Sequence, residues 1–150
     1  MARSSTDRDD VRRRVAEIRR RLAALPQRRA ADLRDLRREV SREVAQWDAR
    51  DVLRLADLLL DDAVIEHRFV ACELVHHHKA AIASVTARDV ERLGRGIDTW
   101  AAVDIFACYV SGPAWREGRL EDARIHRWAR SKDRWWRRAA LVSTVPLNTR

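Results

Sequence analysis

Three side chains have the types and spacing to act together on a nucleic acid. Trp100 and Asp104 are four residues apart, so a helix would present them on one face, and Arg138 follows Asp104 by 34 residues. A carboxylate stabilises developing positive charge or positions a water, an indole stacks on a base or a sugar, and a guanidinium holds a phosphate. The alternative to such a functional role is a structural one. Asp104 lies in the most apolar stretch of the chain, where a carboxylate needs a partner, and an arginine of a following helical repeat could form an ion pair with it.

Cations alternate with indole rings towards the C-terminus, a pattern typical of nucleic-acid grooves, in which cations bind phosphates and rings contact sugars or bases. We expect Trp128 and at least one of Trp135 and Trp136 to be packing residues. The alternative is a solvated arginine face without a ligand. The predicted DNA contacts are Lys132, Arg134, Trp136, Arg137 and Arg138.

A metal site is the less favoured interpretation of Cys72 and the run His76-His77-His78, because three consecutive histidines point in different directions around a helix. A frayed helix end is the simpler interpretation. The sequence has no Gly-rich phosphate loop, Ser/His/Asp signature or CxxC motif. We therefore do not predict a metal site, and we interpret Cys72 and Cys108 as free thiols of a cytoplasmic protein.

Composition excludes several classes of protein. The chain has 150 residues but only 4 Gly and 3 Pro, too few turn residues for an all-β sandwich or barrel. No signal peptide opens it, and no apolar run approaches the roughly 18 residues of a membrane span. The net charge of +8 is concentrated at the two ends, which favours a polyanionic partner such as nucleic acid. A basic protein without such a partner is the alternative.

Hydrophobic spacing predicts a single all-α domain over residues 1–150. Apolar residues recur every three or four positions over 6–25 and 30–46, which predicts an Arg-rich N-terminal helical hairpin within 1–46. Thr6 is the expected N-cap of the first helix, and Pro26 ends it. Three pairs of helices follow over 48–150: 51–60 with 64–78, 86–93 (Gly94 as C-cap) with 98–110 (stopped by Ser111-Gly112-Pro113), and 121–130 with 133–145.

The second helices of these pairs begin 34 and 35 residues apart, which is typical of an α-solenoid of HEAT-like two-helix repeats. Equivalent positions of successive second helices line one face of a solenoid, usually the concave binding face. At a step of 34, Val70, Asp104 and Arg138 are equivalent. The repeat therefore predicts that Trp100, Asp104 and Arg138 lie near one another.

Three stretches resemble the DNA alkylation repair family of AlkD type, over about residues 50–150. They are DVLRLADLLLDDAVIEHRFVACELVHHHKAA, RLGRGIDTWAAVDIFACYVSGPAWREGRL and IHRWARSKDRWWRRAALVSTVPLNTR. The most specific piece is W-x-x-x-D, followed after about 35 residues by W-x-R-[RT]-A or similar. The resemblance implies a right-handed superhelix with a concave DNA-binding face. It makes Asp104 and Trp100 the catalytic residues and implies that Arg138 holds a phosphate.

The activity implied by the resemblance is that of a DNA glycosylase, which hydrolyses the N-glycosidic bond of N3- or N7-alkylated purines. The partner would be double-stranded DNA containing alkylated bases, bound without a base-flipping pocket, by a cytoplasmic monomer that contacts no membrane. The resemblance implies neither a metal nor an organic cofactor. The resemblance also leads us to expect further repeats missing from the C-terminal end. The alternatives are a non-catalytic DNA-binding or scaffold module on the same fold, and a protein-interaction module that uses the end of the solenoid.

Overall fold

The computed structural model describes residues 8–148, and within them every regular element is a helix, which confirms the all-α fold. The ten α-helices are joined by short loops and are accompanied by a π-helical turn, Ala107–Ser111, and a 3₁₀ turn, Val145–Asn148. The α-helices are α1 (Arg8–Ala23), α2 (Ala30–Glu43), α3 (Ala49–Leu59), α4 (Ile65–His77), α5 (Lys79–Ser84), α6 (Ala87–Leu93), α7 (Trp100–Phe106), α8 (Gly112–Arg116), α9 (Asp122–Ala129) and α10 (Arg134–Val142).

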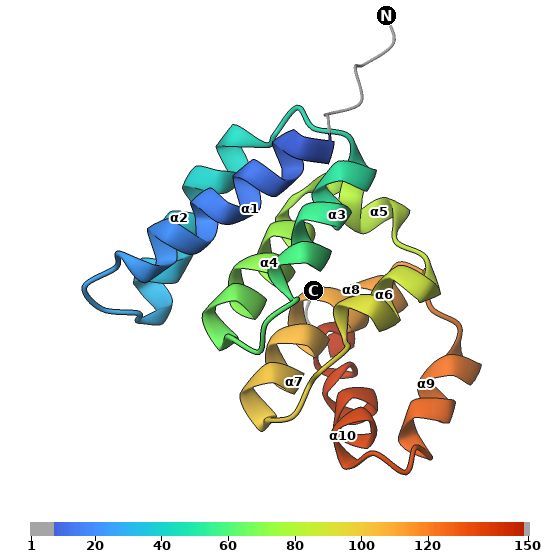
Figure 1. The fold of residues 1–150 in the computed structure, drawn as a ribbon. Coiled ribbons are helices and arrows are strands. Elements are labelled where there is room, and N and C mark those ends of the chain that lie inside the picture. Colours follow the sequence, from blue (N-terminus) through green and yellow to red (C-terminus); the bar gives the residue numbers. More distant parts are fainter. Residues whose placement is uncertain (1–7, 149–150) are drawn as a thin grey trace, which may run out of the picture.

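The helices form two layers. Helices α2, α4, α7 and α10 pack side by side in chain order, each against the next (Figure 1). Helix α3 packs against α1 and α6 to begin the other layer, and α9 packs against α10 at the far end. The predicted succession of second helices is therefore present, and it places α7 and α10 in contact. The HEAT-like classification and the right-handed superhelix remain predictions.

Each predicted stripe of apolar residues faces the core. In α1 the buried residues are Val11, Val15, Ile18 and Leu22, at the predicted spacing of three or four, but the helix ends at Ala23, before the half-buried Leu25 that the sequence placed in the same stripe. Helix α2 buries its own stripe but ends at Glu43, three residues before the expected boundary. The expected N-cap at Thr6 lies outside the described residues. One continuous hydrophobic core runs from α1 to α10, so the helix pairs form a single packed body.

The prediction that Ser111-Gly112-Pro113 stops a helix of residues 98–110 is wrong at both ends. Helix α7 begins at Trp100, where the Thr99 hydroxyl accepts a hydrogen bond from the Ala102 amide at 3.2 Å. It then continues through the π-helical turn into α8, in which Pro113 occupies the first turn. Proline is accommodated in this turn, although its missing amide leaves the Tyr109 carbonyl without a donor from within the helix.

His76 supplies a donor that the proline lacks. In an α-helix the Tyr109 carbonyl would accept a hydrogen bond from the amide of residue 113, but proline has no N–H. His76 Nδ1 lies 3.1 Å from the Tyr109 oxygen, and it must be the donor because a carbonyl only accepts. The frayed end expected for the histidine run is therefore wrong. The ring of His78 is also engaged, since its Nδ1 caps α5, a helix that the sequence analysis missed.

Ion pairs between arginine and carboxylate side chains join successive helix pairs. Several of them connect residues 33 to 39 positions apart, close to the repeat length. Glu73 of α4, only 2% exposed, pairs with Arg37 and Arg34 of α2. Others of this type are Arg28–Glu66, Arg50–Asp89, Asp57–Arg92, Asp61–Arg95, Glu91–Arg124 and Asp104–Arg138.

In the described part of the chain, no helix has both the length and the apolar content needed to cross a bilayer. Cys72 is buried and Cys108 half-buried, and both are free thiols. Burial raises the pKa of the Cys72 thiol to about 12, so this thiol is protonated and unreactive at neutral pH. The cytoplasmic location remains a prediction.

Candidate nucleic-acid interface

Asp104 and Arg138 form a bidentate ion pair between α7 and α10. Arg138 donates from Nε and Nη2 to Asp104 Oδ1 at 3.1 and 3.0 Å, and from Nη2 to Oδ2 at 3.1 Å. The pair is accessible to solvent, because Asp104 exposes 35% and Arg138 43% of the side chain. The apolar neighbours of Asp104 in sequence face the core, whereas the carboxylate reaches the surface. The predicted proximity of Asp104 and Arg138 is confirmed.

Trp100 is the first residue of α7, one turn before Asp104, and it is 65% exposed. Burying an indole is strongly favourable, so a ring exposed to this degree beside an ion pair is a surface available to a ligand. Leu141, on α10 one turn after Arg138, is also exposed, at 71%. The structure thus joins an indole, a carboxylate and a guanidinium at the junction of α7 and α10.

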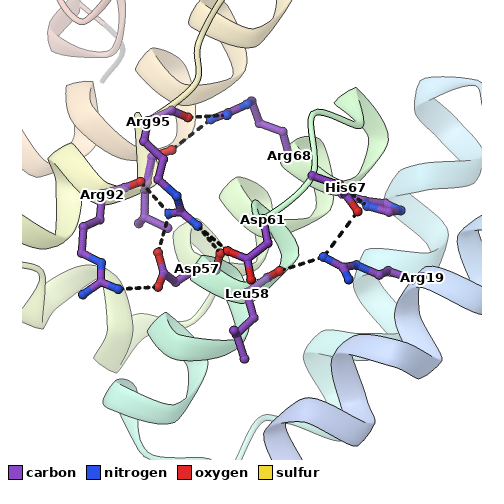
Figure 2. Close-up of polar contacts among 10 residues, drawn as sticks. Arg19, Asp57, Leu58, Asp61, His67, Arg68, Arg92 and Arg95 are labelled. Carbon is purple, nitrogen blue, oxygen red and sulfur yellow. Dashed lines mark hydrogen bonds and ion pairs between the residues drawn. The ribbon is translucent and has the colours of Figure 1, made fainter.

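The loop before α7 is held by arginines of neighbouring repeats. The guanidinium of Arg68 is buried and donates to the carbonyls of Leu93 and Arg95, at 3.0 and 2.6 Å (Figure 2). Arg95 in turn reaches the Asp57 carbonyl at 2.7 Å and Asp61 at 3.0 Å. These bonds fix the entry to α7 and with it the positions of Trp100 and Asp104.

Sequence reasoning did not identify Arg68. Burial lowers the pKa of its guanidinium, although this group stays protonated at any physiological pH. The available signal was an arginine directly before the apolar run Phe69–Cys72. A charge in such a position requires partners inside the fold, but the run itself does not reveal that the partners are backbone carbonyls of another repeat.

Trp136 and Trp128 pack together with Phe106. The ring centroids of Trp136 lie 4.9 Å from Trp128 and 5.8 Å from Phe106. A Cβ on Gly94 would come within 2.6 Å of Trp136 and 2.7 Å of Phe106, so only glycine lets α6 end against these rings. The expectation that Trp128 and one of Trp135 and Trp136 are packing residues is confirmed. Trp136 is half-buried, and its contact with DNA remains a prediction.

The predicted cations differ in how they are held. Arg137 donates to the carbonyls of Ser131 and Lys132 at 2.7 and 2.9 Å and so closes the loop between α9 and α10. The Arg134 guanidinium lies over the Trp135 ring, 4.6 Å from its centroid, a cation–π contact that leaves its charge exposed. Lys132 is exposed, and no ion pair within residues 8–148 engages it. Of the predicted cations only Arg138 pairs with a carboxylate in the described residues, and Arg134 and Lys132 are those bonded to neither a carboxylate nor a carbonyl.

The described residues contain no group of three or more His, Cys, Asp and Glu side chains that could hold a metal ion. Cys108 lies one turn after Asp104. Burial and the nearby Asp104 charge both raise the pKa of its thiol, which keeps the group in its protonated, weakly nucleophilic form at neutral pH. The chemistry available at the junction of α7 and α10 is therefore that of a carboxylate, a guanidinium and an indole.

The chain matches one known protein family over most of its length. Residues 25–150 match the model of the family described as DNA alkylation repair enzyme. The chain belongs to this family. Membership supports a role in DNA repair as an enzyme, with DNA as its substrate, and confirms the resemblance noted in the sequence. No curated protein and no solved structure matches the chain.

Proposed function

We propose that the protein is a DNA glycosylase that hydrolyses the N-glycosidic bond of N3- and N7-alkylated purines in duplex DNA. The observation that carries this proposal is the accessible Asp104–Arg138 ion pair with the exposed Trp100 ring one turn away. Each of the three groups matches one part of such a substrate. The carboxylate suits a cationic sugar, the guanidinium a phosphate, and the indole the face of a deoxyribose or a base.

Alkylation at N3 or N7 makes the purine a cation, which weakens the bond from its nitrogen to C1′ of the deoxyribose. As that bond breaks, its electron pair leaves with the neutral base, and the sugar acquires oxocarbenium character. The Asp104 carboxylate stabilises this positive charge and orients a water, whose oxygen bonds to C1′ and whose proton is released. The Trp100 face adds a cation–π interaction with the same sugar. None of these steps uses a cofactor.

Arg138 has to exchange partners when DNA binds. An ion pair as exposed as Asp104–Arg138 contributes at most about 1 kcal/mol, so little free energy opposes its opening. A backbone phosphate offers Arg138 an equivalent bidentate acceptor of the same charge. Once Arg138 binds the backbone, the Asp104 carboxylate loses its neutralising partner beside the sugar, where its charge is needed. Lys132 and Arg134 would contact phosphates further along the strand.

The test is base release from a duplex that contains N7-methylguanine. Asp104→Asn keeps the size of the side chain and removes its charge, so we expect release to fall roughly a hundredfold or more. DNA binding should persist, because the substitution leaves every cation in place. Release and binding are measured on the same preparation, the first by quantifying free base and the second by fluorescence anisotropy.

Asp35→Asn is the matched control. Asp35 also pairs with an arginine, Arg38, at an exposed position of α2, far from α7 in the chain. Its removal should leave base release unchanged. Wild-type release by Asp104→Asn would make Asp104 a structural residue and contradict the proposal, as would a folded, DNA-binding wild type that releases no base.

A non-catalytic DNA-binding or scaffold module is the second candidate function. It is favoured by the series of arginine–carboxylate pairs between successive repeats, of which Asp104–Arg138 is a member by its separation of 34 residues. In that function the pair only joins α7 to α10. The exposed indole of Trp100 speaks for the enzyme, because a pair that served only to join two helices would not need a tryptophan left in solvent beside it.

A further inference from the structure

A second concave region lies between α6, α9 and α10, and the proposed glycosylase mechanism does not use it. This hollow has a volume of about 730 Å³, within the roughly 300–1,000 Å³ of small-molecule sites. Its lining residues are Glu91, Ala123, Arg127, Trp128, Arg130, Ser131 and Trp136. It combines two arginines with two indole rings.

The hollow and the Asp104 site flank the same helix on different sides. Trp136 and Arg138 are two residues apart on α10, so their side chains leave the helix about 200° apart. Arg138 reaches towards Asp104 on α7, whereas Trp136 packs against Trp128 on α9. A ligand in the hollow would therefore not compete with one at Asp104.

The carboxylate of the hollow is already satisfied. Glu91 accepts hydrogen bonds from Arg124 at 2.8 Å and from the Trp128 indole at 3.1 Å. Burial alone would raise the pKa of Glu91, but these two bonds and the nearby arginine charges hold it below its usual value. Glu91 is thus an anion that pairs with Arg124. The two arginines that line the hollow, Arg127 and Arg130, have no bonded carboxylate in the described residues.

Arg127 and Arg130 are exposed, and no side chain within residues 8–148 forms an ion pair or hydrogen bond with either guanidinium. Most arginines of the N-terminal hairpin, by contrast, have carboxylate partners, as Arg14 and Arg21 do with Glu43. Two unsatisfied guanidinium groups beside a half-buried indole match a ligand with a negative charge and a flat ring. Duplex DNA presents phosphates to such a surface but keeps its bases stacked inside, whereas an unpaired nucleotide presents both groups.

We propose that the hollow between α6, α9 and α10 binds an unpaired nucleotide of a nucleic-acid strand, with its phosphate on Arg127 and Arg130 and its base against Trp136. This inference is independent of the glycosylase proposal, because it involves neither Asp104 nor Trp100. The site gives the protein affinity for a single strand. It reads no sequence, because every base has a π-face and the hollow offers no free carboxylate to select one.

The test uses the whole chain and a fluorescent single-stranded oligothymidylate of about eight nucleotides, with binding followed by anisotropy. The double variant Arg127→Ala/Arg130→Ala should bind roughly tenfold more weakly. It should also lower the slope of log K against log salt by about 0.7, the contribution of one neutralised phosphate of a single strand. Both arginines are exposed and unpaired in the described residues, so the variant keeps the fold.

A charge-matched control and an abasic strand separate the base from the phosphate. Arg20→Ala/Arg88→Ala removes two exposed arginines that are equally without partners in the described residues, and it should bind as the wild type does. An abasic oligonucleotide of the same length should bind roughly tenfold more weakly than oligothymidylate and should not quench tryptophan fluorescence.

Three outcomes would overturn the inference. Equal affinity for the abasic strand would show that no base enters the hollow. Equal losses of affinity in the two double variants would show that net charge alone governs binding. An oligoglutamate of the same charge that binds as tightly as oligothymidylate would show that the arginines recognise any polyanion. Base release depends on Asp104, whereas oligothymidylate binding depends on Arg127 and Arg130, so a failed glycosylase assay and a failed inference remain distinguishable.

Discussion

The Asp104 carboxylate pairs with Arg138 in the free protein, and we propose that it stabilises a cationic sugar when DNA is bound. Its exposure to solvent determines how easily the ion pair separates. Both oxygens bind Arg138, yet about a third of the side-chain surface meets solvent. A buried pair would strongly oppose separation, because each charge would lose its only compensation. An exposed pair separates at little cost, so the residue that holds Asp104 in the free protein is also available to hold a phosphate.

Arg138→Ala tests this exchange at the residue scale. We expect weaker binding of duplex DNA and a slope of log K against log salt that is shallower by about 0.9, the contribution of one phosphate on a duplex. The slope is obtained from anisotropy titrations at several salt concentrations. An unchanged slope would remove Arg138 from the DNA backbone and leave it as the structural partner of Asp104. Arg38→Ala, which breaks the exposed pair with Asp35, is the matched control.

The helix that carries Asp104 is shaped by its irregular continuation. Helix α7 passes through the π-helical turn Ala107–Ser111 into α8 without a break, although Pro113 lacks an amide hydrogen. The Gly112 amide bonds the Ala107 carbonyl, and His76 bonds the Tyr109 carbonyl from α4. Turns of this kind often lie at functional sites. Here the turn begins three residues after Asp104, so α4 helps to hold the helix that presents the carboxylate.

His76→Ala tests that hydrogen bond at the element scale. Removal of the donor leaves the Tyr109 carbonyl without its partner, and we expect unfolding in urea to require about 1–2 kcal/mol less free energy near neutral pH. Burial, aided by the positive charge of Arg116, lowers the pKa of His76 below its usual 6.5. The unfolded chain therefore takes up a proton first as the pH falls through 6.5, and wild-type stability declines below that value.

The variant should show a shallower decline of stability as the pH falls below 6.5, because one imidazole with a lowered pKa is gone. His77 and His78, whose pKa values burial also lowers, keep the remainder of the slope. His126→Ala removes an exposed imidazole from α9 and should change stability very little. If His76→Ala unfolds at the same urea concentration as the wild type, the hydrogen bond to Tyr109 does not support the helix.

Charge at the scale of the whole molecule is distributed differently from what the sequence indicates. The sequence places an excess of basic residues at both ends. In the structure many N-terminal arginines are paired, for example Arg21 with Glu39 and Glu43. Cations without a carboxylate partner in residues 8–148 gather instead around α9 and the start of α10, where they comprise Arg119, Arg127, Arg130, Lys132, Arg134 and Arg137. A polyanion is therefore expected at the C-terminal end.

Matched charge reversals test this asymmetry. Lys132→Glu/Arg134→Glu should weaken duplex binding strongly and reduce the salt slope by about 2, at roughly 0.9 for each phosphate that is no longer neutralised. Arg20→Glu/Arg42→Glu makes the same change in net charge on the N-terminal hairpin, at exposed arginines also without a described partner. It should have a small effect on the slope. Equal effects would mean that long-range attraction, rather than a surface near α10, governs binding.

Periodicity and composition were sufficient for several features. The all-α class follows from the scarcity of glycine and proline, and the apolar stripe of α1 follows from its steps of three and four residues. The repeat of 34 residues places Asp104 beside Arg138, because equivalent residues of stacked helices are neighbours by construction. These features depend on the spacing of residues along the chain, which the sequence gives directly.

Other features were decided only by the tertiary structure, because they depend on partners distant in sequence. The sequence predicts that Pro113 ends a helix, but in the structure His76, 37 positions earlier, supplies the donor that the proline lacks. Arg68 is a buried cation whose acceptors are carbonyls of the next repeat. Likewise, whether an arginine is paired depends on which carboxylate the packing of the helices brings within reach. The sequence therefore determined the net charge, whereas the tertiary structure determined where the unpaired charges lie.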